Sequence, residues 1–343
     1  MAIFFYLSKK FSEFVWKRQK KYIPLQCFKM ILLYMINRAL IRLKIVQILY
    51  AYYQNGSNNL DAAEKELLFS LSKAYDLYNY LLLLMVDLTE SAATRIENGK
   101  LKKLATAEDI HPNMRFVENK FIVQLQCNKM LLDYQERQKR SWLTSHEDFV
   151  KQLLDKIQES DIYKDYMGKA ESTYDEDRNF WRAIYKSFIS KNVELEDLLE
   201  EMSLYWNDDK EIVDTFVLKT INRFSEKEGA DQQLLPEFKD EEDRTFAVRL
   251  LRRTVLNCDE YRRMVSENTR NWDINRVAFM DVLIMQVALA EILSFSNIPV
   301  SVSLNEYVEI AKYYSTPKSG AFVNGTLDGI VKMLRKEGKI TKN

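Results

Sequence analysis

Glycine and proline are scarce in this chain, which has eight glycines and five prolines among 343 residues. So few turn residues argue against a protein built from many short strands and hairpins. Leu, Ile, Glu, Lys and Arg instead recur at helical spacing almost throughout. The composition therefore predicts an all-α protein, and a hydrophobic fraction of 47% is enough to bury a substantial core.

Cysteine and histidine are also rare. The three cysteines, Cys27, Cys127 and Cys258, are far apart and form no CxxC pair, so neither a disulfide framework nor a zinc site is expected. His111 and His146 stand in separate polar contexts, and a surface or helix-cap role explains each better than catalysis. We therefore expect no catalytic residue, no metal and no cofactor, in a protein that is not an enzyme.

Long apolar runs are missing too. A membrane-spanning helix needs about 18 or more consecutive apolar residues, and the longest candidate, "YNYLLLLMVDL", is interrupted by Asp87. We expect a soluble protein of the reducing cytoplasm, without a membrane partner.

The formal net charge is zero, but the charges are unevenly distributed. Residues 1–34 hold seven basic residues and one acidic residue, a net of +6, and residues 241–343 have a net of +2. The remaining residues, 35–240, carry 28 basic and 36 acidic side chains, a net of −8. This acidic middle would repel RNA or bind a basic protein, although ordinary solvated helix faces explain it more simply.

The opening segment, residues 1–34, differs in composition from the rest of the chain. It is basic and aromatic, and it ends directly before a clean amphipathic pattern that begins after Met35. It is either a basic arm for RNA or a membrane surface, or an extension that lies upstream of the true start at Met30 or Met35. The abrupt change in composition favours the second interpretation, an N-terminal extension that is disordered or wrongly assigned to the chain.

Helical periodicity organises the rest of the chain. Within residues 36–54, "INRALIRLKIVQILYAYYQ", apolar side chains form one stripe and predict an amphipathic core helix. The stripe consists of Ile41, Ile45, Ile48, Leu49 and Tyr52. A polar stretch containing Gly229 and Pro236 predicts a boundary. We therefore expect an expanded N-terminal helical subdomain at 35–240 and a C-terminal helical subdomain at 241–343.

The C-terminal part is predicted to form four helices, the first with a break near Asn257. Ser303 and Glu306 have the spacing of a capping box and predict the start of the third helix. On the last helix, "SGAFVNGTLDGIVKMLRKEG", the buried stripe is predicted to be Val323, Leu327, Ile330 and Leu334.

Half of the eight glycines lie between Gly320 and Gly338. Phe322, Gly325 and Gly329 share a second face of the last helix, about 100° from the buried stripe. A glycine inside a helix costs about 1 kcal/mol relative to alanine, so two within five residues need a reason. Either a neighbouring helix packs closely here, or a ligand backbone approaches while a base stacks on Phe322.

The residues from 271 to 330 carry a resemblance to a known family. They join an Ile-Pro, an Asn-Glu, an Ala-Lys and a Phe-Val-Asn-Gly in the order and spacing found in the NusB family of bacterial transcription antitermination factors. "RLKIVQILYAYY" resembles the first helix of the same family. Between these segments, at about 100–240, the chain is far longer than a usual member, so we expect extra inserted helices there.

The resemblance implies an all-α, NusB-like bundle of two helical subdomains that binds boxA-type RNA together with the ribosomal protein NusE in the transcription elongation complex. Carried over by position, it implies nine site residues. Those implied to bind RNA are Arg38, Arg42, Gln47, Lys318, Phe322 and Asn324, and those implied to bind the partner are Tyr50, Asp281 and Glu291.

One departure from the family pattern matters. Where the family has several consecutive arginines, this chain has "NRALIR", with only Arg38 and Arg42. Without the resemblance, a pair of arginines at the rim of the first helix is the simpler interpretation. An alternative function is therefore a helical protein-binding scaffold with weakened or lost RNA binding. A ribosomal RNA cytosine methyltransferase with a NusB-like domain is disfavoured, because the chain has no glycine-rich cofactor loop and no cysteine after a proline.

Overall fold

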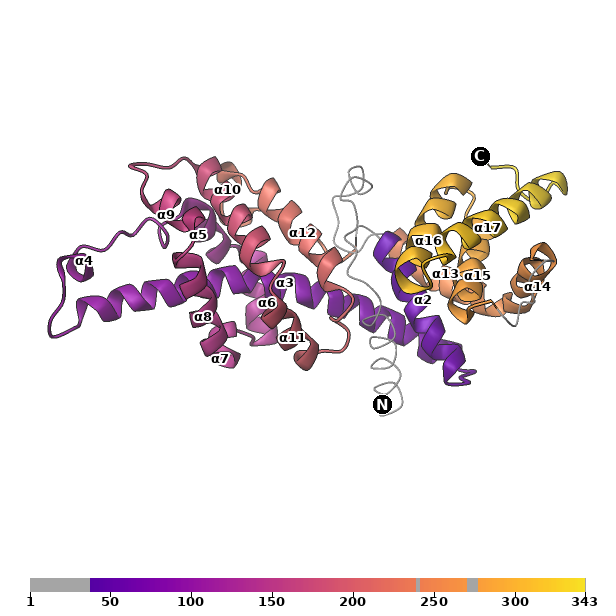
Figure 1. Ribbon diagram of the computed structural model, residues 1–343, viewed down its shortest axis with the longest axis horizontal. Helices are drawn as coiled ribbons and strands as arrows, with labels where there is room; N and C mark the ends of the chain where they lie inside the picture. The colour runs from indigo at the N-terminus through magenta and orange to yellow at the C-terminus, as the bar shows by residue number, and fades with distance from the viewer. Residues whose placement is uncertain (1–37, 239–240, 270–276, 343) are drawn as a thin grey trace. The chain divides into compact units, whose positions relative to one another are not determined.

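The computed structural model describes residues 38–238, 241–269 and 277–342 (Figure 1). All regular structure in these ranges is helical and contains no β-strand, which confirms the predicted all-α fold. The chain divides into two compact units: unit 1 joins Met1–Ser72 to Phe238–Asn343, and unit 2 is Lys73–Glu237. The expected N-terminal extension, residues 1–34, lies outside the described residues.

The division differs from the expected one in one respect. The boundary expected near residue 240 lies close to the end of unit 2, but the first helix, α2 (Arg38–Gln54), belongs to unit 1 and not to the middle of the chain. The reason is packing, since α2 contacts α13 (Glu241–Leu256) and α15 (Phe279–Ser294). Unit 2 is thus an insertion of helices within the sequence of unit 1.

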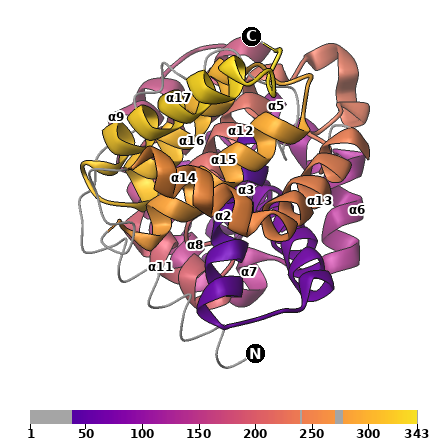
Figure 2. The same ribbon diagram turned by 90° about the vertical axis from the view of Figure 1, so that its right-hand side faces the viewer.

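Unit 1 is built around α15, which contacts α2, α13 and three further helices (Figure 2). The three are α14 (Cys258–Asn268), α16 (Val300–Tyr314) and α17 (Ser319–Lys336). Residues 280–292 of α15 are all buried. A helix that is apolar on nearly every side is buried on every side, and this sequence has no broad polar face.

Two predictions for the C-terminal helices are confirmed and one is wrong. The break falls at Asn257, between the end of α13 and the start of α14, and the stripe Val323, Leu327, Ile330 and Leu334 is fully buried. The capping box is wrong, because α16 begins at Val300 directly after Pro299, so Ser303 lies inside the helix. Pro299 is the N-cap residue and has a non-helical backbone, so the helix starts directly after it.

The helix α2 is more deeply buried than its apolar stripe predicted. Residues 40–46 are all buried, and they include Arg42 and Lys44. Tyr52, at the end of the stripe, is half-buried. Arg42 and Lys44 therefore lie inside unit 1 instead of forming part of a solvated face.

Unit 2 consists of the C-terminal part of α3 (Leu60–Lys100) and the helices that come after it. These are α4 (Ala107–Ile110), α5 (Lys120–Gln126), α6 (Lys129–Gln138), α7 (Trp142–Ser145), α8 (Glu147–Gln158), α9 (Asp161–Met167), α10 (Tyr174–Ile184), the π-helix η1 (Tyr185–Ile189), α11 (Val193–Met202), α12 (Lys210–Arg223) and the 3₁₀-helix η2 (Glu226–Asp231). The expected helical insertion is therefore present.

The core of unit 2 is aromatic. Trp142, Trp181 and Trp206 are almost completely buried. The ring of Tyr80 on α3 stacks on Trp142, with 4.2 Å between ring centres, and Trp142 Nε1 donates to the carbonyl oxygen of Tyr80 at 2.8 Å. Large aromatic rings bury much apolar area per residue, and the indole N–H needs a partner when buried.

Candidate nucleic-acid interface

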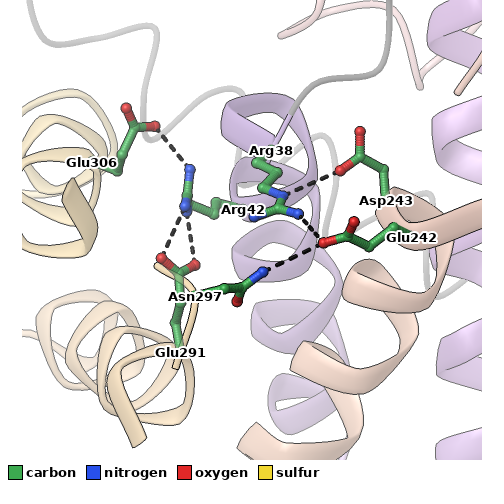
Figure 3. Close-up of polar contacts among 7 residues, drawn as sticks. All are labelled: Arg38, Arg42, Glu242, Asp243, Glu291, Asn297 and Glu306. Carbon is green, nitrogen blue, oxygen red and sulfur yellow. Dashed lines mark hydrogen bonds and ion pairs between the residues drawn. The ribbon is translucent and has the colours of Figure 1, made fainter. Parts of the chain in front are cut away.

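The guanidinium of Arg42 lies in a buried cluster between α2, α15 and α16 (Figure 3). Its Nε and Nη2 donate to the two carboxylate oxygens of Glu291 at 2.8 and 2.9 Å, and its Nη1 donates to Glu306 at 3.3 Å. Glu291 also accepts hydrogen bonds from Ser303 Oγ at 2.7 Å and Tyr307 Oη at 3.0 Å. We call these five residues the Arg42 cluster.

Burial and charge act against each other in the Arg42 cluster. The side chain of Arg42 is 4% exposed and that of Glu291 is 0% exposed. Burial alone lowers the pKa of Arg42, but the attraction of Glu291 and its hydrogen bonds outweigh burial, so the pKa lies above its ordinary value. Burial also raises the pKa of Glu306, an effect that Arg42 partly offsets. A bidentate pair with further hydrogen bonds is the arrangement that best compensates desolvation of both charges.

Arg38 makes a second set of ion pairs, on the side of α2 that faces α13. Its Nη2 lies 2.8 Å from Glu242 and its Nε lies 3.1 Å from Asp243, as Figure 3 shows. The guanidinium lies 5.0 Å from the ring centre of Phe246. The side chain is 29% exposed. Arg38 therefore connects α2 to α13 at the surface of unit 1.

The structure places three of the expected site residues inside unit 1. Arg42 and Glu291 were expected to reach RNA and a partner protein, but both are buried and bind each other. Asp281, the other expected partner contact, is also buried, and its carboxylate accepts a hydrogen bond from Ser319 at 2.8 Å. Their contacts in unit 1 join α2 to α15 and α17 to α15.

The expected residues of α17 have a different environment. Lys318 and Asn324 are exposed, and Phe322 is half-buried. Gly325, next to Asn324, is also exposed. We call these four residues the α17 face. Lys318, Phe322 and Gly325, at i, i+4 and i+7, follow one side of the helix, and Asn324, two positions after Phe322, lies on another exposed side.

Gly325 and Gly329 of α17 have different surroundings, so one explanation does not cover both. A Cβ atom added at Gly329 would lie 3.8 Å from the side-chain oxygen of Asn268 on α14, which is an ordinary packing contact. A Cβ atom at Gly325 would meet no atom of the described chain within 4 Å. Packing therefore does not explain Gly325, and its bare backbone lies open on the α17 face.

Asp281 attaches the start of the α17 face to the core. Its hydrogen bond from Ser319 lies at the first residue of α17, beside Lys318. Burial raises the pKa of Asp281, and hydrogen bonds from Ser315 and Ser319 partly offset this effect. The loop before α17 is thus attached to the start of the central helix α15.

Gln47 and Tyr50 of α2 are both half-buried. The ring of Tyr50 lies 5.7 Å from the ring of Phe279, at the start of α15. The structure therefore separates the nine expected residues into an interior group, a half-buried pair on α2 and the α17 face, with Arg38 at the surface between α2 and α13.

Three residues that complete the interior group were not expected at a site. Ser303, Glu306 and Tyr307 of α16 surround Arg42 and Glu291. The sequence predicts only a capping box for Ser303 and Glu306. Their spacing could have predicted that they act together, because positions 303, 306 and 307 lie on one face of a helix.

The fold and this polar interior define an all-α protein whose central apolar helix is flanked by a buried arginine–glutamate pair. The NusB family model matches residues 212–332. The chain is 36% identical over 132 residues to the transcription antitermination protein NusB of Salinibacter ruber, covering 37% of this chain and 82% of that protein. The chain belongs to the NusB family.

Two further comparisons cover different shares of the known proteins. The NusB protein of Chloroherpeton thalassium is 36% identical over 98 residues, which are 29% of this chain and 46% of that protein. A solved structure of T. maritima NusB is 25% identical, covers 47% of this chain and 95% of its own, and has a TM-score of 0.28. The family match begins inside α12 and does not include α2.

None of the helices in the described ranges is long and apolar enough to cross a membrane.

Proposed function

We propose that this chain is an RNA-binding adaptor in transcription antitermination of ribosomal RNA operons. It binds boxA-type RNA together with the ribosomal protein NusE, and through them it joins the transcription elongation complex in the cytoplasm. It assembles partners and catalyses no reaction. Membership of the NusB family supports this role, because the relatives are transcription antitermination proteins.

The observation that carries the RNA-binding proposal is the open α17 face. Phe322 offers a ring on which a base can stack, Lys318 can contact a phosphate, and Asn324 can hydrogen-bond a base edge. Gly325 leaves room for the RNA backbone to approach the helix. Tyr50 is the expected partner contact that remains outside the fully buried interior, so the NusE contact is assigned to the surface around it.

A protein-binding scaffold with weakened RNA binding is the second candidate. The ion pairs of Arg38 and Arg42 favour it, because both arginines are neutralised by acidic residues of unit 1. RNA affinity depends strongly on the number of phosphates that cations neutralise. With these two cations occupied, the α17 face supplies fewer phosphate contacts than an arginine-rich helix would.

Fluorescence anisotropy with a labelled boxA RNA, with and without NusE, at several salt concentrations distinguishes the two candidates. The adaptor binds the RNA, binds it more tightly with NusE, and has a shallow salt dependence because few phosphates are contacted. A chain that binds NusE but shows no RNA binding at low salt, alone or with NusE, is the scaffold.

A further inference from the structure

Unit 1 has a second surface feature, a groove between the first turns of α3 and the outer face of α13. Its volume is about 620 Å³. Leu68, Val248 and Leu256 provide its apolar lining, and Leu256 is 70% exposed. A leucine so exposed at the end of a groove gains free energy if a partner covers it. We call this feature the α3–α13 groove.

The same groove is lined by four arginines of α13. Arg252 pairs with two carboxylates in the first turns of α3 at 2.8 and 2.6 Å, so it fixes the two helices together. Arg249 donates to a backbone carbonyl oxygen at 2.8 Å but stays exposed. Arg244 and Arg253 are exposed as well. Three accessible cations therefore border the apolar strip.

The α13 side of the groove follows one face of the helix. Positions 244, 248, 249, 252, 253 and 256 recur every three to four residues, so they form one face of α13 that extends about 18 Å. The apolar positions of this face, Val248 and Leu256, lie about 12 Å apart along α13, with arginines between and beside them. This arrangement complements a helix whose leucines, two turns apart, are flanked by acidic residues.

The other occupants fit less well. RNA would leave the apolar side chains of the lining, Leu68, Val248 and Leu256, without an apolar partner. Residues 1–34 of this chain have a net charge of +6, the same sign as the accessible arginines. We propose that the α3–α13 groove binds an acidic amphipathic helix of a protein partner, at a place separate from the α17 face.

The test uses the full chain and two labelled helical peptides of about 18 residues, enough to span the groove. Both have leucines at positions i, i+4 and i+7, flanked by glutamates in one peptide and by lysines in the other. The glutamate peptide should bind at least about tenfold more tightly than the lysine peptide. Leu256→Asp and Arg253→Glu should each weaken its binding by about tenfold or more.

Two matched controls keep this result specific. Arg263→Glu makes the same change of charge at an exposed residue of α14, and Leu104→Asp places an acid at a residue of unit 2 that is 91% exposed. Neither should change the affinity, and circular dichroism should show all four variants folded. Equal binding of the two peptides, or equal effects of the controls, overturns the proposal.

Two further outcomes would assign the groove to another occupant. If single-stranded RNA displaces the glutamate peptide and Arg253→Glu weakens RNA binding, the groove is an RNA surface. If sedimentation shows a dimer that Leu256→Asp dissociates, the groove is covered by a second copy of the chain. Either result contradicts a helix of a different protein.

Discussion

The NusB resemblance assigns two segments of this chain to RNA binding, the arginines of α2 and the first turns of α17. In the structure they differ in almost every property. Arg42 is 4% exposed and bound to two glutamates, whereas Lys318, Asn324 and Gly325 are exposed at the surface. A position that matches the NusB pattern therefore predicts where a residue lies along its helix. It does not predict whether that side of the helix is buried.

The difference has a physical origin in what packs on each helix. The helix α2 is covered by α13 and α15, and its neighbours supply four carboxylates for two arginines. The helix α17 packs on α14, α15 and α16 through its apolar stripe, and its opposite side is open. Substitutions at each place test this contrast between an interior cluster and an exposed face.

The largest effect is expected in the interior. Glu291→Ala leaves the guanidinium of Arg42 buried with only the longer pair to Glu306, so the free energy of unfolding should fall by about 3–5 kcal/mol. Urea denaturation followed by far-ultraviolet circular dichroism measures the change. Glu306→Ala is the matched control, and it should cost only about 1 kcal/mol because Arg42 keeps its bidentate partner. Similar costs for the two variants would show that the pair with Glu291 is not the dominant contact.

Phe322→Ala tests the exposed face. Loss of one stacking platform should weaken boxA RNA binding by about 1–3 kcal/mol and leave its salt dependence unchanged, since no phosphate contact is removed. Anisotropy titrations over a range of salt concentrations measure both quantities. A lower melting temperature with unchanged RNA affinity per folded molecule would reassign Phe322 to packing.

Substitutions at Gly325 should change the free energy of unfolding least, and the larger side chain should reduce RNA binding. Gly325→Ala should raise the free energy of unfolding by about 0.5–1 kcal/mol, because alanine is the better helix former and its Cβ meets nothing. Urea denaturation measures this gain. Gly325→Leu should also fold, but its side chain should block the approach of RNA in anisotropy titrations. A destabilised alanine variant would mean that another part of the molecule packs on this glycine.

Much of the fold could be predicted from periodicity alone. The stripe of α17 and the break at Asn257 come from local patterns, and the structure has both. The grouping of α2 with the C-terminal helices could not be predicted from local patterns, because the contacts that produce it join residues far apart in the sequence. Arg42 and Glu291, for example, are separated by 249 positions.

The site was harder to predict for a related reason. The NusB resemblance implies ligand contacts for Arg42 and Glu291, which requires both at the surface, where charged residues of a helix usually lie. Their burial depends on mutual neutralisation and on Ser303 and Tyr307, which hydrogen-bond to Glu291 from another helix. Local spacing carries no information about such a partner. Phe322 and Gly325 could be singled out because a ring beside bare backbone is unusual in its own segment.

The most direct test of the account compares two cations that the family resemblance treats alike. Arg38→Gln removes a residue that is ion-paired to Glu242 and Asp243, and Lys318→Gln removes an exposed one. Plots of the logarithm of the boxA affinity against the logarithm of salt concentration should keep their slope for Arg38→Gln. For Lys318→Gln the slope should become shallower by about one unit. The opposite result, a shallower slope for Arg38→Gln and an unchanged one for Lys318→Gln, would contradict the account by placing the RNA on α2.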